Sequence, residues 1–255
     1  MNPLLDQSAR PVIGHRGAAA YAPENTLVSF ARALELGADA LEFDLRRSAD
    51  GVPVVMHDPI LDRTTDRSGP VAALTAAELG RVDAGYRFDE LGERSFAFRG
   101  KGIGVPTLRD VITAFPGVPL LIEIKEREVQ EAVARDLIDL DATHRAVVAG
   151  DDWRSLTAFE RPPFARGASR RDIAALFFHW GPPAPSCRCY AVPESYYGLP
   201  VPSRRFVNAA HRRDSTVHVW TVDHAKAALA LWRRGVNGIV TNRPDVIRAA
   251  HPHAA

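Results

Sequence analysis

The feature that most constrains this chain is a regular alternation of short apolar segments with helical segments, from about residue 11 to the C-terminal part. Eight apolar segments are typical of strands followed by helices, and they begin at Pro11, Ala40, Pro119, Arg145, Phe164, Cys187, Thr216 and Val236. Strands that alternate with helices over short connections form parallel sheets. Eight such units in 255 residues predict an α/β fold of the TIM (β/α)8 barrel type.

A doubly wound open sheet is the main alternative, because it uses the same alternation. That fold commonly carries a Gly-x-Gly-x-x-Gly turn after its first strand. The first strand, "PVIGHR", leads instead into "GAAAYAPENT", which lacks this spacing. The helix that follows is expected over "ENTLVSFARALELG", with Gly37 as its stop.

One segment interrupts the alternation. The second strand, "ALEFDLRR", is expected to turn at Asp50-Gly51 into "VPVVMHD" as a hairpin. From about 62 to 105 the chain has only a short helical signal, near Thr75–Leu79, and four aromatic residues that favour an ordered cap. We therefore expect a single domain over 1–255, with an insertion after the second strand on the side where such barrels keep their sites.

Carboxylates stand on two neighbouring strands of the expected barrel. Because strand side chains alternate, Glu42 and Asp44 share one face, and the apolar residues between them share the other. The apolar face must pack against helices, so the two carboxylates are expected inside the barrel. In "LLIEIK" the same argument places Glu123 and Lys125 inside.

Three inward carboxylates near strand ends need compensation, because buried like charges repel one another and lose hydration. A hard divalent cation supplies it, and oxygen ligands favour Mg²⁺ or Ca²⁺ over zinc. The alternative is a set of salt bridges, from Glu42 or Asp44 to Arg46 or Arg47 and from Glu123 to Lys125. The repetition on two strands favours the metal.

Two histidines end apolar segments beside these carboxylates. His15 ends "PVIGH" and His57 ends "VVMH", which places both at the expected mouth of the barrel. Histidines there suit proton transfer near neutral pH, while Arg16 and Lys125 suit phosphate oxygens. Asp58 could orient its neighbour, but because it precedes a proline we prefer to interpret it as turn chemistry. A metal, two histidines and two cations together indicate phosphoryl chemistry.

The overall charge excludes some classes of partner. With 32 basic and 31 acidic residues, no strong field directs the chain to nucleic acid or to an anionic membrane. No apolar run approaches membrane-spanning length, so stable membrane insertion is not expected. Cys187 and Cys189, two apart in an expected strand, should point the same way without bridging. A reduced, cytoplasmic protein is the simplest interpretation, and the oligomeric state stays open.

Several segments together resemble one family. They are "GHRG", "APENTLVSFARALELGADALEFDLRRSADGVPVVMHDPILDRTT", "SGPV", "VPTLRDVI", "LLIEIK", "VHVWTVD" and "GVNGIVTNRPD". In this order and spacing they resemble the glycerophosphodiester phosphodiesterase family through nearly the whole chain. The resemblance implies a TIM barrel with an insertion after the second strand. It also implies hydrolysis of small glycerophosphodiesters to glycerol 3-phosphate and an alcohol.

The resemblance also implies roles for individual residues. His15 and His57 would be the acid–base pair, and Arg16 and Lys125 would contact phosphate. Glu42, Asp44 and Glu123 would bind the divalent metal. Glu24 would face the metal or its ligands, Asn25 would support the ligands from behind, and Trp220 would form a wall for glycerol.

This chain departs from the family pattern at Asn237 and Asn242, where aspartates are common. Both look like turn and strand-end positions, where asparagine keeps the hydrogen bonding. Two other functions remain open. One is a phospholipase D-like hydrolase of lysophospholipid or sphingomyelin head groups, which would need an apolar entry. The other is a silent phosphodiester-binding protein, which should have lost a histidine or a metal carboxylate.

Overall fold

Eight parallel strands close into a barrel in the computed structural model, which describes residues 2–89, 92, 95–178, 186–196 and 198–251. In barrel order they are β1 (Val12–His15), β2 (Ala40–Arg47), β4 (Leu120–Ile124), β5 (Ala146–Ala149), β6 (Ala165–Gly167), β7 (Cys187–Pro193), β10 (Thr216–Trp220) and β11 (Gly238–Thr241). The barrel closes because β1 pairs in parallel with both β2 and β11. The predicted TIM barrel is therefore confirmed, and each of the eight expected segments contributes one of these strands.

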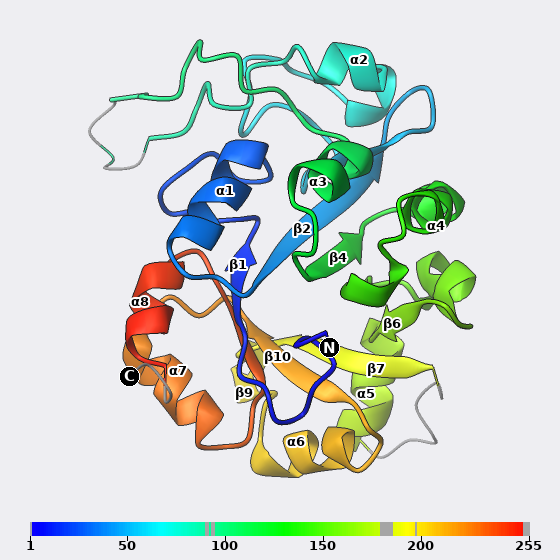
Figure 1. Ribbon diagram of the computed structural model, residues 1–255, viewed down its shortest axis with the longest axis vertical. Coiled ribbons are helices and arrows are strands. Elements are labelled where there is room, and N and C mark those ends of the chain that lie inside the picture. Colours follow the sequence, from blue (N-terminus) through cyan, green and yellow to red (C-terminus); the bar gives the residue numbers. More distant parts are fainter. Residues whose placement is uncertain (1, 90–91, 93–94, 179–185, 197, 252–255) are drawn as a thin grey trace.

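Helices cover the outside of the barrel (Figure 1). They are α1 (Leu27–Glu35), α3 (Leu108–Ala114), α4 (Gln130–Asp139), α5 (Arg170–Phe178), α6 (Arg204–His211), α7 (Ala225–Trp232) and α8 (Pro244–Ala249), with 3₁₀ helices η2 (Arg127–Val129), η3 (Thr143–Arg145) and η4 (Trp153–Phe159). Among the residues that the structure describes, no helix is both long and apolar enough to cross a membrane.

The first helix begins three residues later than the sequence pattern predicts. Asn25 has a φ of +58°, outside the helical region, and the Thr26 hydroxyl accepts a hydrogen bond from the Ser29 amide at 3.2 Å. Thr26 is therefore the N-cap, and helix α1 starts at Leu27. The helix ends before Gly37, whose φ of +87° makes it the stop that the sequence predicts.

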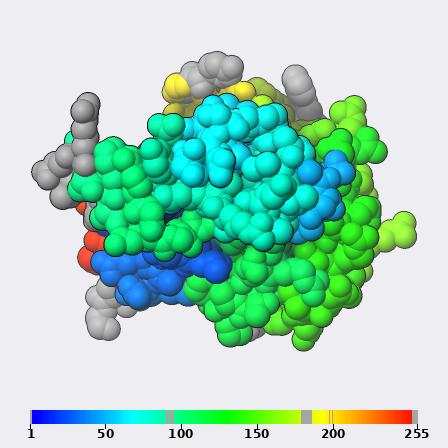
Figure 2. All heavy atoms as spheres, turned by 90° about the horizontal axis from the view of Figure 1, so that it is seen from above, coloured from blue at the N-terminus to red at the C-terminus, as the bar shows by residue number. Residues whose placement is uncertain are grey.

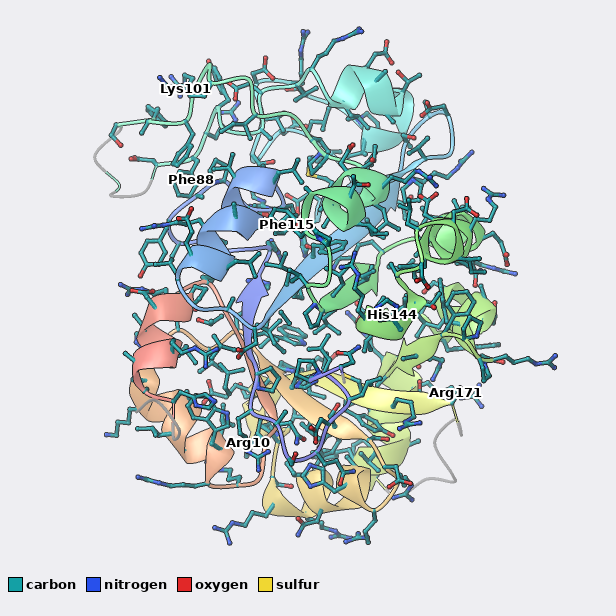
Figure 3. The ribbon with its side chains drawn as sticks, viewed as in Figure 1. Arg10, Phe88, Lys101, Phe115, His144 and Arg171 are labelled. Carbon is teal, nitrogen blue, oxygen red and sulfur yellow. The ribbon has the colours of Figure 1, made fainter. Side chains whose placement is uncertain are left out.

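Alternation along β2 separates the core from the interior of the barrel. Leu41, Phe43 and Leu45 are fully buried and pack outward in the largest apolar cluster, where Phe43 lies 5.5 Å from Phe30 of α1 between ring centroids. The same cluster includes Phe115, at the end of α3 (Figure 3). The other face of β2 carries Glu42 and Asp44 and turns inward, as the sequence predicts.

The interior of the barrel is apolar at the N-terminal ends of the strands. Buried side chains fill it, and the segment before β1 closes it from below. Leu4 in that segment is fully buried, and its carbonyl accepts a hydrogen bond from the Thr216 hydroxyl at 2.6 Å. The opposite end of the barrel is consequently the open one.

The two cysteines do not point the same way, so that prediction is wrong. Cys187 packs outward with Tyr190 and Val192, whereas Cys189 packs among the interior residues. Consecutive residues of β6 pair with the two cysteines of β7: Arg166 with Cys187 and Gly167 with Cys189. This irregularity in the register lies between the two cysteines and reverses the in-and-out alternation of side chains along β7. Both cysteines are buried and unbridged.

The insertion forms a cap with its own small core. It follows β3 (Pro53–Val55), which pairs antiparallel with β2 as the predicted hairpin, and it contains η1 (Val71–Ala73) and α2 (Ala76–Leu79). Met56, Leu61 and Leu79 are buried in this core. Figure 1 shows the arrowheads of β1 and β2 pointing toward the cap, and Figure 2 shows its broad outer surface. Its residues Phe88 and Lys101 lie toward the end of the molecule opposite Arg10 (Figure 3).

Candidate active site

The candidate site is a cavity of about 560 Å³ at the C-terminal ends of the barrel strands. Eight of the sequence-predicted residues line it: His15, Arg16, Glu42, Asp44, His57, Glu123, Lys125 and Trp220. Register explains how distant segments meet there, because His15 pairs with Glu42 across β1 and β2, and Asp44 pairs with Glu123 across β2 and β4. The cavity is therefore a direct product of the strand pairing.

The loop after β1 approaches helix α1 very closely, and Gly17 makes this possible. Its φ is +89°, and a Cβ built on it would lie 2.5 Å from the carbonyl carbon of Ser29. Only glycine combines that dihedral with that distance. This close packing fixes the backbone that carries His15 and Arg16.

We expect Gly17→Ala to lower the unfolding free energy by more than about 3 kcal/mol, because it adds a backbone clash to the strain of a positive φ. Gly102→Ala is the matched control, since Gly102 has a φ of +72° but no atom within 4 Å of a built Cβ. The control should lose only about 1–2 kcal/mol. Chemical denaturation of both variants measures the difference, and equal losses would contradict the packing argument.

Three carboxylates meet in the cavity. Glu42, Asp44 and Glu123 each offer one oxygen, and these oxygens all lie within 4.8 Å of one another. Glu42 and Asp44 are buried, and the Glu123 side chain is 29% exposed. Such a cluster of hard oxygen donors is the kind of site that a divalent cation occupies.

Asp44 is the carboxylate whose negative charge is balanced by cationic side chains of the protein. Its Oδ1 lies 2.9 Å from Lys125 Nζ, its Oδ2 lies 3.2 Å from Arg16 Nε, and Asn25 Nδ2 donates to Oδ2 at 3.0 Å. Although burial raises the pKa of Asp44, the charges of Lys125 and Arg16 outweigh it and lower that pKa. Asn25 thus supports Asp44 from behind, outside the cavity lining, as the resemblance implies.

The salt-bridge alternative holds only in part. Lys125 Nζ does pair with Glu123 Oε1, at 2.7 Å. Arg46, however, pairs with Glu126 at 2.6 Å rather than with Glu42 or Asp44. Among the described residues, Glu42 has no ion pair within 4 Å, and its Oε2 accepts a hydrogen bond from the Arg16 backbone amide at 2.9 Å.

Glu42 is therefore the carboxylate whose charge the protein compensates least, through the Arg16 amide and without an ion pair among the described residues. Burial raises its pKa well above the ordinary value, and the charges of Asp44 and Glu123 raise it further. Burial also raises the pKa of Glu123. A cation bound among these three oxygens would remove the repulsion between them, so the donor set fits a divalent metal.

Each histidine is held through its Nδ1 atom. His15 Nδ1 lies 2.7 Å from Asn242 Oδ1, and Asn242 Nδ2 donates to Asp223 Oδ2 at 2.7 Å. Because the amide nitrogen is used by Asp223, the oxygen faces His15, and His15 Nδ1 must donate the hydrogen. The other ring nitrogen, Nε2, is then an unprotonated acceptor when the imidazole is neutral. Burial and the neighbouring Arg16 charge lower the pKa of His15, which favours that form.

The corresponding partner of His57 is a carboxylate. His57 Nδ1 lies 2.7 Å from Asp58 Oδ1. Although partial burial raises the pKa of Asp58, hydrogen bonds from Arg63 and His57 lower it to about 2. The Asp58 carboxylate can accept only through its oxygens, so His57 Nδ1 donates the hydrogen and the contact fixes the orientation of the ring. Interpreting Asp58 as turn chemistry alone is therefore wrong.

Arg63, in the cap, was not singled out by the sequence pattern. Its Nη1 and Nη2 donate to Glu24 Oε2 and Oε1 at 2.8 and 2.7 Å, and its Nε donates to Asp58 Oδ2 at 2.6 Å. Glu24 in turn accepts from Arg16 Nη1 at 2.8 Å. Glu24 therefore faces Arg16 and Arg63, outside the group of three carboxylates, and Arg63 links the supports of Arg16 and His57.

We expect Arg63→Ala to lower kcat/KM about tenfold, because the supports of Arg16 and His57 lose their common clamp. Arg63→Lys should recover only part of this loss, since an ammonium cannot reproduce the fork. Arg67→Ala is the matched control, because the Arg67 side chain is 67% exposed and makes a long contact, with its Nε 3.9 Å from Asp66 Oδ2. A loss of kcat/KM in Arg67→Ala equal to that in Arg63→Ala would contradict the positioning role.

Comparison with known proteins bears on this geometry. The model of the glycerophosphoryl diester phosphodiesterase family matches residues 15–246. The chain belongs to this family. It is a phosphoric diester hydrolase, and the match spans the cavity residues from His15 to Val240.

Similar chains cover this family member almost from end to end. The protein YhdW of Bacillus subtilis (strain 168) is 31% identical in an alignment of length 255 that covers 92% of this chain and 96% of YhdW. The glycerophosphodiester phosphodiesterase of Caldanaerobacter subterraneus subsp. tengcongensis (strain DSM 15242 / JCM 11007 / NBRC 100824 / MB4) is 28% identical in an alignment of length 247 that covers 92% of this chain and 95% of that one.

Solved structures share the fold. An Oleispira antarctica phosphodiesterase in complex with the product sn-glycerol-3-phosphate is 25% identical, with a TM-score of 0.76 over 95% of this chain and 96% of that one. The glycerophosphoryl diester phosphodiesterase domain of Rv2277c from Mycobacterium tuberculosis superposes with a TM-score of 0.82 over 94% and 98% of the chains. At 20% identity the second comparison supports the barrel alone.

Proposed function

We propose that this family member hydrolyses glycerophosphodiesters to glycerol 3-phosphate and an alcohol, using a divalent metal and two histidines. The observation that carries the proposal is the meeting of both histidines with the three-carboxylate cluster in one cavity. The product named in the Oleispira antarctica structure, sn-glycerol-3-phosphate, supports the substrate class.

Glu42, Asp44 and Glu123 would hold the metal, Mg²⁺ or Ca²⁺. A bound divalent cation supplies Lewis-acid stabilisation of charge on phosphate oxygens. Arg16 and Lys125 line the same cavity and add positive charge for the non-bridging oxygens. Trp220, at the end of β10 and 41% exposed, offers an aromatic wall for the glycerol carbons.

The two histidines take opposite roles. His15, whose Nδ1 is held by an amide, accepts at Nε2 the proton of the attacking hydroxyl, whether that hydroxyl belongs to glycerol or to water. As the new P–O bond forms, the P–O bond to the alcohol breaks. Attack by water gives glycerol 3-phosphate directly, whereas attack by the glycerol hydroxyl gives a cyclic phosphate that water must then open. His57, whose Nδ1 is held by the Asp58 carboxylate, donates its Nε2 proton to the leaving alkoxide. The net proton transfer runs from the nucleophile to the leaving group.

The compartment and the domain limits are part of the same proposal. Two buried, unbridged cysteines support a reduced, cytoplasmic setting, and the apolar clusters around one barrel support a single domain over 1–255. The near-neutral charge balance supports a small-molecule substrate rather than nucleic acid.

The test is turnover of glycerophosphocholine and glycerophosphoethanolamine, with glycerol 3-phosphate identified as product. We expect turnover with added Mg²⁺ or Ca²⁺, loss of at least about 10²-fold in excess chelator, and recovery on adding metal back. Full activity in chelator would overturn the metal dependence. Tight binding of the diester without turnover would instead indicate the silent binding protein.

A further inference from the structure

The cavity is divided into a charged part and an apolar part that follow the strand order. His15, Arg16, Glu42, Asp44, His57, Glu123 and Lys125 come from β1, β2, β4 and the segment after β3, which lie side by side in the barrel. The opposite arc runs from β6 through β7 to β10 with the helix α5 behind it. The two parts thus face each other across one opening.

The apolar part takes its side chains from several elements of the barrel. Four of its side chains come from α5: Ile173, Ala174, Phe177 and Phe178. Val201 comes from the segment beyond β7, and Trp220 is the last residue of β10. Seven large hydrophobic side chains of the described residues are exposed, and three of them, Phe178, Tyr196 and Trp220, line this cavity. Exposed apolar groups gathered in one place mark a binding surface.

The charge of this wall argues against a cationic head group. Among the described lining residues from β6 to β10, Arg170 is the single charged one, and its Nη2 lies 2.6 Å from Asp151 Oδ2. No unpaired carboxylate therefore stands on the described part of this wall to attract choline. Aliphatic side chains alternate with the aromatic ones, which suits a hydrocarbon chain better than an aromatic cage.

We propose that the apolar part of the cavity binds an aliphatic chain carried by the phosphodiester, so that the preferred substrates are single-chain, lipid-like phosphodiesters. This rests on the proposed function, because the phosphate must sit among the charged residues for a chain to reach α5. The chain can be attached to the leaving alcohol or to the glycerol. Both sources share a phosphate and one hydrocarbon chain.

The test measures kcat/KM for two homologous series below their micelle concentrations. One series carries ethyl, butyl, hexyl and octyl alcohols on glycerol 3-phosphate, and the other carries short acyl chains on the glycerol of glycerophosphocholine. We expect kcat/KM to rise about twofold to fourfold per methylene in the series whose chain reaches the wall. A flat response in both series would overturn the proposal. Absence of turnover for every ester, including glycerophosphocholine, would instead remove the proposed function itself.

Matched surface variants connect the response to α5. Phe178→Ser should reduce the octyl-to-ethyl ratio at least threefold, and Ala174→Asp should reduce it further, because a charge on the wall opposes a hydrocarbon chain. Ile138→Ser is the control: Ile138 on α4 is also 55% exposed, and it is absent from the cavity lining. Ratios that stay unchanged in both wall variants, or that fall equally in the control, would place the chain elsewhere and overturn the proposal.

Discussion

Replacing His57 with asparagine is expected to lower kcat by about 10²- to 10⁴-fold, because the leaving alkoxide loses its proton donor. His57 is 34% exposed, so the substitution removes little packing, and the unfolding temperature should change by only a few degrees. His144→Asn is the matched control, since His144 is exposed and 4.0 Å from its partner Asp141. Steady-state assays with glycerophosphocholine measure the loss.

The leaving group separates the two histidine roles. A p-nitrophenolate leaves without protonation, so a glycerophospho-p-nitrophenol substrate should restore most of the lost kcat in His57→Asn. The same substrate should restore little in His15→Asn, because the nucleophile still lacks its base.

The pH profile gives a second readout: burial lowers the pKa of His15, so activity should persist below the ordinary histidine pKa before the acidic limb begins. Restoration in both variants, or in neither, would contradict the assignment.

The charged half of the site could be predicted because alternation along a strand is a local rule. The apolar residues of β2, Leu41, Phe43 and Leu45, must pack against helices on the outside of the barrel. Because side chains alternate along a strand, Glu42 and Asp44 must then point into the barrel. The strand order then brings Glu123 beside Asp44. Few long-range facts were needed, since neighbouring strands in a βα barrel are usually neighbours in sequence.

The support of His15 and the contacts of Arg63 could not be predicted in this way. Asn242 follows β11 and reaches His15 only because β11 closes the barrel against β1, which is a contact across 227 positions. Arg63 lies in the cap, where no periodicity gives the direction of a side chain. The prediction that the two cysteines point the same way was wrong for a related reason. A single irregularity in the pairing of β6 with β7 reverses the alternation of side chains, and it leaves no local sequence signal.

Glu42→Gln is expected to move activity and stability in opposite directions. Activity should fall by at least about 10²-fold, because one metal carboxylate is lost. The metal-free protein should become more stable near pH 8, by about 1 kcal/mol, because folding then no longer has to bury or protonate a carboxyl group beside Asp44 and Glu123. Glu35→Gln is the control, with a side chain 65% exposed on α1, and it should change neither property.

The pH dependence follows from the raised pKa of Glu42. In the interval between its unfolded and folded pKa values, the folded protein holds a proton that the unfolded chain has released, so stability falls as pH rises through that interval. Glutamine cannot titrate, and the slope should disappear in the variant. Metal should also stabilise the two proteins differently: at 100 times its Kd, a cation adds about 2.7 kcal/mol to the wild type, but little to the variant. Denaturation curves with and without Mg²⁺ or Ca²⁺ measure both effects. If the metal-free variant is less stable than the metal-free wild type, the Glu42 carboxylate stabilises the fold through its protein contacts. That result would contradict its proposed role as a metal ligand that costs stability without the cation.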